Sequence, residues 1–122
     1  MFEDLREFVG ELERRGQLVT LTGELDPRYE VAAALRALDQ RGLAGRVRVR
    51  GYGVPVVGNL LRDPARLGLA LGVDPERMEA EYLRRRERPL EPVPVRARPE
   101  VEVGERFDLL EHLPVLTHHR RD

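Results

Sequence analysis

The chain has 122 residues, a length that suits one folded domain around a modest hydrophobic core. Its 21 basic and 22 acidic residues leave a net charge of -1, so no overall field draws it toward nucleic acid or an anionic membrane. Every basic residue is arginine, and lysine, cysteine and serine are absent, which excludes Schiff-base lysines, zinc thiolate sites and the usual acyl-transfer nucleophiles.

The sequence also lacks the marks of a targeted or membrane protein. No apolar run approaches the roughly 20 residues that a membrane helix needs, and the first residues lack the apolar core of a signal peptide. We therefore expect a cytoplasmic protein with no membrane segment. The bias from lysine to arginine fits heat adaptation and a GC-rich genome equally well.

The first predicted elements are an amphipathic helix and a short strand. The helix has apolar residues at the three- and four-residue spacing of one helix face: Leu5, Phe8, Val9 and Leu12. Gly16 should end this helix, and residues 18–22 should form the strand.

Three Asp-Pro pairs predict helix starts, because aspartate caps a helix N-terminus and proline suits the first helical position. The pairs are Asp26-Pro27, Asp63-Pro64 and Asp74-Pro75. The three helices should end near residues 42, 71 and 86, and in the last of them Met78 and Tyr82 should face inward. We interpret these aspartates as structural caps, because the adjacent prolines fit capping better than paired catalytic acids.

Residues 46–61 form the stretch around which the domain should be organised. Val47 and Val49 alternate with arginines, as in a strand with one apolar face. Residues 51–53 supply a glycine-containing turn, and the second arm, residues 54–57, is apolar enough to need cover from helices. The prediction is an α/β (α+β) fold, in which about four helices cover a small sheet with a central hairpin.

Composition changes at Pro89, because four prolines interrupt residues 89–99. We predict a folded domain over residues 1–88, and a proline-rich linker and docking arm over residues 89–122. A further short strand is expected at residues 101–103. An apolar turn should follow, with Phe107, Leu109, Leu110 and Leu113.

Three constellations have side chains suited to chemistry or binding. The first carries metal-ligating types at His112, His118, His119 and Asp122. Adjacent histidines on an extended segment point in opposite directions, so a metal site within this chain is not expected.

The second constellation comprises two arginine groups, at residues 46–50 and 84–88. Their acidic neighbours and few aromatic residues favour a salt-bridged surface over a nucleic-acid site. The third, at residues 51–53, resembles a phosphate-binding loop but joins strand to strand.

Several stretches, taken in order, carry a resemblance to a known family. They begin with Asp-Leu-Arg-Glu-Phe at residues 4–8 and continue at residues 12–18, 24–27, 51–60 and 69–72. The most specific part is Phe-Asp-Leu-Leu at residues 107–110 with Leu-Pro-Val-Leu-Thr-His-His at residues 113–119 and Asp122. Together these stretches resemble the UbiD-like decarboxylases. The resemblance covers nearly all of this chain, but only about the first quarter of a family member.

The resemblance implies a small N-terminal domain that packs on a domain binding prenylated FMN and a divalent metal. Family members decarboxylate aromatic and α,β-unsaturated acids with residues downstream of Asp122, so no catalytic, cofactor or metal ligand is assigned here. The residues expected to contact the cofactor domain are Leu113, Thr117, His118 and His119. Alone, the chain should be inactive and bind no cofactor.

Two interpretations of function therefore stay open. The chain is either a fragment or small subunit of a UbiD-like decarboxylase, or a non-catalytic protein-protein interaction module. The expected partners are the missing cofactor and C-terminal domains, in cis or as a separate subunit, and a second copy of the chain in a homo-oligomer. An arginine-mediated nucleic-acid binder is the weakest alternative, and we expect no nucleic-acid partner.

Overall fold

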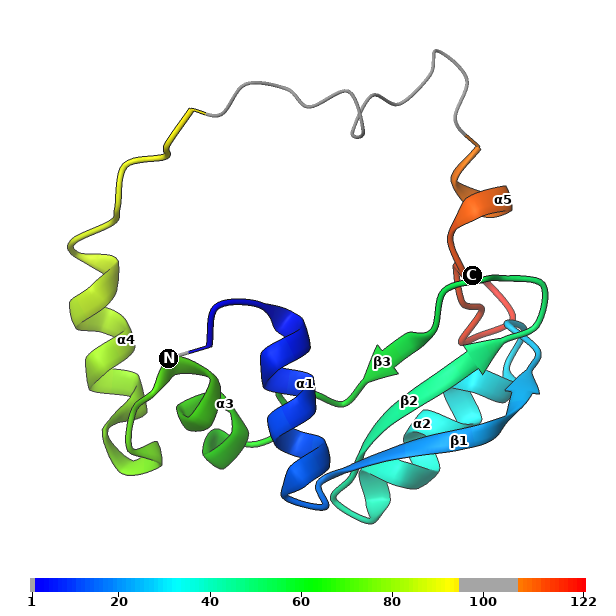
Figure 1. Cartoon of the computed structure of the whole chain (residues 1–122), viewed down its shortest axis with the longest axis horizontal. Helices are drawn as coiled ribbons and strands as arrows, with labels where there is room; N and C mark the ends of the chain where they lie inside the picture. The colour runs from blue at the N-terminus through cyan, green and yellow to red at the C-terminus, as the bar shows by residue number, and fades with distance from the viewer. Residues whose placement is uncertain (1, 95–107) are drawn as a thin grey trace.

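A mixed sheet of three strands lies at the centre of the structure, a computed structural model that describes residues 2–94 and 108–122 (Figure 1). The strands are β1 (Leu18–Leu25), β2 (Ala44–Val49) and β3 (Val56–Gly58), in that order across the sheet. β1 runs parallel to β2, and β2 runs antiparallel to β3. The predicted hairpin is confirmed. Its second strand begins at Val56 because Val54 belongs to the turn, where it is 46% exposed.

Helix α2 (Glu30–Gln40) connects the two parallel strands and covers one face of the sheet (Figure 1). Val31 of α2 and Val47 and Val49 of β2 are buried together between these layers. The apolar alternation in β2 therefore gives the strand its buried face. The fold is α+β, as the sequence predicted.

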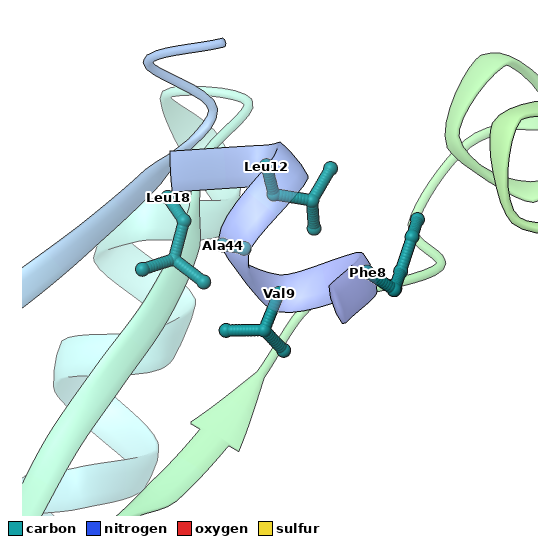
Figure 2. Packing of buried hydrophobic residues seen from close by; sticks show 5 residues of the cluster. All are labelled: Phe8, Val9, Leu12, Leu18 and Ala44. Atoms are coloured by element: carbon teal, nitrogen blue, oxygen red, sulfur yellow. The ribbon is translucent and has the colours of Figure 1, made fainter. Parts of the chain in front are cut away.

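Helix α1 (Leu5–Arg14) packs against the sheet where strands β1 and β2 begin. Asp4 caps it by accepting a hydrogen bond of 2.9 Å from the Glu7 amide. The predicted apolar face is confirmed, because a second buried cluster comprises Phe8, Val9, Leu12, Leu18 and Ala44 (Figure 2).

Two further helices follow the hairpin, α3 (Pro64–Leu71) and α4 (Met78–Arg86), joined by a 3₁₀ turn at Pro75–Arg77. Asp63 caps α3 as predicted, accepting from the Arg66 amide. Asp74 caps the 3₁₀ turn by accepting from the Glu76 amide, whereas α4 itself begins at Met78 without a side-chain cap. The inward position predicted for Tyr82 is wrong, because its side chain is 53% exposed. Met78 is half-buried. The physical reason is that α4 packs mainly on α3 and the 3₁₀ turn, so no core covers its far side.

The predicted start of α2 at the first Asp-Pro pair is also wrong. The helix begins at Glu30, and Asp26 instead stabilises a turn by accepting from the Arg28 amide at 2.7 Å. The Asp26 amide in turn donates to the Glu30 carboxylate at 2.7 Å. These bonds hold residues 26–28 in a turn that precedes the helix.

The described part of the arm contains one short helix, α5 (Leu109–His112), which confirms the predicted turn there. The strand expected at residues 101–103 and the apolar contact expected of Phe107 lie outside the described residues. The division at residue 88 stays a prediction. Within residues 2–94 and 108–122, no helix has the length and apolar character needed to cross a bilayer.

Candidate docking surface

The end of the arm returns to the α/β domain instead of pointing away from it. Residues 113–117, here called the closing segment, run beside the turn that precedes α2 (Figure 1). The Thr117 amide donates to the Pro27 carbonyl at 3.1 Å, and the Tyr29 amide donates to the Thr117 carbonyl at 3.1 Å. Leu116 packs against the buried cluster of Val31, Val47 and Val49. The closing segment therefore completes one side of the core.

A second contact ties α5 to the hairpin. The Tyr52 hydroxyl donates a hydrogen bond of 2.7 Å to the Leu110 carbonyl. Tyr52 itself is half-buried and packs against the same cluster as Leu116. The arm is thus held at two points, one within its short helix and one after it.

The four residues predicted to face a cofactor domain have different surroundings. Thr117 is half-buried because it pairs with the turn before α2, whereas Leu113, His118 and His119 are exposed. Only Thr117 contacts the domain through hydrogen bonds of its own backbone. The expectation that all four contact a cofactor domain stays a prediction.

Asp122 organises the residues after the closing segment. Its carboxylate accepts backbone hydrogen bonds from His119 at 2.7 Å and from His118 at 2.6 Å. These bonds, that of His119 first, lower the pKa of Asp122 because they favour the charged carboxylate. Among the described residues, no group of three or more His, Asp or Glu side chains is placed to hold a metal. Here Asp122 stabilises a turn.

Apolar side chains stay exposed along the arm and on the hairpin turn beside it. We call this set the apolar edge; it comprises Val54, Leu109, Leu110, Leu113 and Val115. Leu110 is the most exposed of them, at 63%. Exposed apolar groups gathered near one edge are typical of a surface that another protein covers.

The arginines at residues 46, 48 and 50, here called the arginine row, lie on the face of the β2 segment opposite the buried Val47 and Val49, and each is paired with an acidic side chain. Arg46 lies 3.6 Å from Glu13, Arg48 lies 2.8 Å from Glu24, and Arg50 lies 3.5 Å from Asp26. On α4, Glu81 likewise bonds Arg84 and Arg85, which lowers the pKa of Glu81 to about 2. The predicted salt-bridged surface is confirmed for these arginines.

Two hollows test whether the described residues fit a flavin. One, of about 370 Å³, lies between α1 and α3 and is lined by Phe2, Asp4, Leu5, Phe8, Leu60, Leu61 and Ala70. Its only charged side chain is an aspartate, which would repel a phosphate. The other, of about 360 Å³, lies beside α4 and is rich in arginine, but Glu81 already engages Arg84 and Arg85. Neither of these two hollows combines phosphate donors with an apolar wall, so neither fits FMN. A third hollow, of about 410 Å³ beside the hairpin turn, does bring Arg46 and Arg48 next to apolar residues, but both arginines are already paired with glutamates.

Sequence reasoning missed a buried polar site, here called the hub, in which the Arg66 side chain joins three loops. The Arg66 side chain, 3% exposed, donates to the carbonyls of Asn59 at 2.8 Å and Gln17 at 3.2 Å, and also to that of Gly42. The Asn59 side chain donates to the Leu35 carbonyl at 2.7 Å. An arginine in a short helix normally indicates exposed surface, so the sequence offers no reason to place Arg66 in the interior. The structural mark of this site is the turn beside it, where Asn59 has a positive φ of 59°.

Comparison with known proteins places this arrangement in context. Residues 9–86 match the family model described as the 3-octaprenyl-4-hydroxybenzoate carboxy-lyase N-terminal domain. The chain is similar to the UbiD-class enzyme HmfF from Pelotomaculum thermopropionicum, solved as an evolved dimeric form in complex with prFMN. That match has 35% sequence identity and a TM-score of 0.80, and it covers 97% of this chain and 28% of that one.

A second solved relative is the vanillic acid decarboxylase of Sedimentibacter hydroxybenzoicus in its open form. Its sequence identity is 29% and its TM-score 0.73, over 98% of this chain and 28% of that one. The present chain therefore spans less than a third of the length of the enzymes that it matches.

Proposed function

Because the chain belongs to the 3-octaprenyl-4-hydroxybenzoate carboxy-lyase N-terminal domain family, we propose that it serves as the N-terminal domain of a UbiD-like decarboxylase. It is a fragment or a small subunit of that enzyme and is inactive alone. The substrates of the complete enzyme are aromatic or α,β-unsaturated carboxylic acids, and prenylated FMN with a divalent metal supplies the chemistry outside this chain.

One observation carries the proposal. The structural match to the prFMN-bound enzyme covers 97% of this chain, whereas the family model covers only residues 9–86. The similarity therefore extends beyond α4 into the arm. A shared arm supports a shared route from this domain into the rest of an enzyme.

The physical character of the described residues supports a docking role rather than a catalytic one. Their buried charged side chain, Arg66, donates to backbone carbonyls and thereby holds three loops together. The hollows beside α1 and α4 do not fit a flavin, and the apolar edge is open to a partner surface. The partner we propose is the cofactor domain, in the same polypeptide or in a separate subunit.

A chimera tests the proposal. The 28% of the Pelotomaculum enzyme that matches this chain is replaced by residues 1–122, and the product is compared with the enzyme lacking that part. Loading with prenylated FMN is followed by absorbance, and release of carbon dioxide from an unsaturated acid is measured. We expect release from the chimera and not from the truncated enzyme.

Two outcomes would contradict the proposal in different ways. A chimera that folds and holds its flavin, yet releases no more carbon dioxide than the truncated enzyme, would remove the decarboxylase role. If this chain binds the truncated enzyme as a separate polypeptide without restoring turnover, the interaction module is favoured instead.

A further inference from the structure

The turn before α2 holds a residue in an unfavourable backbone conformation. Tyr29, at the N-cap position of α2, has φ 73° and ψ −34°. A residue with a Cβ atom rarely adopts a positive φ, and this ψ lies outside the left-handed helical region as well. Such strain persists only where the surrounding contacts enforce it.

Local side-chain bonds do not account for this conformation. Asp26 holds the Arg28 amide, and Glu30 holds the Asp26 amide, both at 2.7 Å. The N-cap residue of α2 makes no side-chain capping bond, unlike the caps of α1 and α3. The Tyr29 side chain lies instead near Arg28, whose guanidinium is 5.8 Å from the ring centroid.

The bonds that flank the strained residue come from the closing segment. Thr117 accepts from the Tyr29 amide and donates to the Pro27 carbonyl, so one residue of the arm spans the turn on both sides. Leu116 fixes Thr117 there by packing against the cluster that contains Val31, two residues after Tyr29. The Tyr29 carbonyl then accepts from the Ala33 amide at 2.8 Å, in the first turn of α2.

We infer that Tyr29 and Thr117 form a conformational latch between the arm and helix α2. With Thr117 docked, Tyr29 is held at positive φ and α2 begins at Glu30. With Thr117 withdrawn, Tyr29 relaxes to a negative φ and the first turn of α2 opens. The inference goes beyond the proposed function, because it concerns how docking of Thr117 determines where α2 begins.

The strain at Tyr29 opposes docking of Thr117, whereas the hydrogen bonds of Thr117 favour it, so these two effects largely offset each other. A strained residue costs about as much free energy as a pair of neutral hydrogen bonds contributes, so relief of the strain offsets much of the loss of the two Thr117 bonds, and the packing of Leu116 favours the docked state. A partner that binds residues 118–122 or the apolar edge can therefore shift the equilibrium without unfolding the sheet.

Amide hydrogen exchange of the full 122-residue chain tests the latch. Thr117→Pro removes the amide that bonds Pro27, whereas Thr117→Ala keeps it and serves as the matched control. In Thr117→Pro we expect the amides of Tyr29 and Ala33 to exchange about tenfold faster, as loss of roughly one hydrogen bond implies. The amides of α1 should keep their wild-type rates.

A second substitution separates strain from ordinary destabilisation. Tyr29→Gly accepts a positive φ without strain, so Thr117→Pro should accelerate the Ala33 amide less in that background than in the wild type. If Thr117→Pro does not fold, Leu116→Ala replaces it, with the same rates expected to rise. Equal acceleration across the whole chain, or an unchanged Ala33 rate, would overturn the latch. An equal effect of Thr117→Pro with Tyr29 and with Gly at position 29 would do so too.

Discussion

Gly45 and Gly58 face each other across strands β2 and β3, and Leu35 of α2 packs over both. A Cβ atom at Gly58 would lie 2.7 Å from the Leu35 Cδ1 atom, and one at Gly45 would lie 2.6 Å from the Leu38 Cδ1 atom. These glycines therefore let the helix approach the sheet closely, which no larger residue permits without a shift.

Gly58→Ala should destabilise the domain by about 1–3 kcal/mol, because the new methyl group overpacks the Leu35 side chain. Combined with Leu35→Ala, it should cost less than the sum of the two single substitutions, since the space is then available. Urea unfolding measures all three variants. Gly23→Ala is the control, because nothing lies within 4 Å of a Cβ there. Additive losses would show that the contact is not responsible.

Arg66→Met should lower the free energy of unfolding by about 2–4 kcal/mol, because three carbonyls lose the donor that satisfies them. Arg62→Met is the matched control from the segment just before α3. It breaks a more exposed pair with Asp39 at 2.8 Å, so its cost should stay below about 1 kcal/mol. Equal effects of the two substitutions in denaturant unfolding would contradict the role assigned to the hub.

The pKa of Glu81 predicts a specific dependence of stability on pH. Its hydrogen bond with Arg84, then that with Arg85, lowers the pKa from 4.5 to about 2 in the folded chain. The stabilisation is therefore complete above pH 4.5 and is lost as the pH falls toward 2. The difference in unfolding midpoint between wild type and Glu81→Gln should narrow over that range. It should also shrink in high salt, because the two ion pairs lie at the surface of α4. Glu79→Gln, on the same helix, is the control, and a constant difference at every pH would refute the assignment.

The paired arginine row predicts negligible binding of nucleic acid. Fluorescence anisotropy with labelled single-stranded and duplex DNA should show no binding at about 0.15 M salt. Binding that persists there and weakens steeply at higher salt would reveal phosphate contacts, since phosphate neutralisation releases counterions.

Limited proteolysis tests the predicted boundary at residue 88. Leu90 is 95% exposed, so a protease that cuts beside leucine should act there before it cuts α1 to α4. Mass spectrometry identifies the first product. First cleavage inside residues 5–86 would contradict a folded domain that ends near residue 88.

The elements that the sequence predicted well are those specified by neighbouring residues. Asp63 sits directly before the helix that it caps, and the alternation of Val47 and Val49 is local to β2. Such signals need no knowledge of the rest of the chain.

The errors arose where a distant segment decides the outcome. α2 begins three residues after the Asp-Pro pair because residues 27–29 pair with Thr117, about 90 positions downstream. Arg66 is buried because loops from three other parts of the chain turn their carbonyls toward it. No local pattern distinguishes that arginine from its exposed neighbours.

The late position of the closing segment in the chain bears on how the domain folds during synthesis. Helices α1 to α4 and the sheet are complete once residue 86 is made, but Thr117 follows 31 residues later (117 − 86). At a translation rate of roughly 5–20 residues per second, the nascent domain waits about 2–6 seconds for the segment that covers Val31 and Val47. During that interval the site for Leu116 is uncovered, so this end of the sheet is accessible to other apolar segments before Leu116 is made.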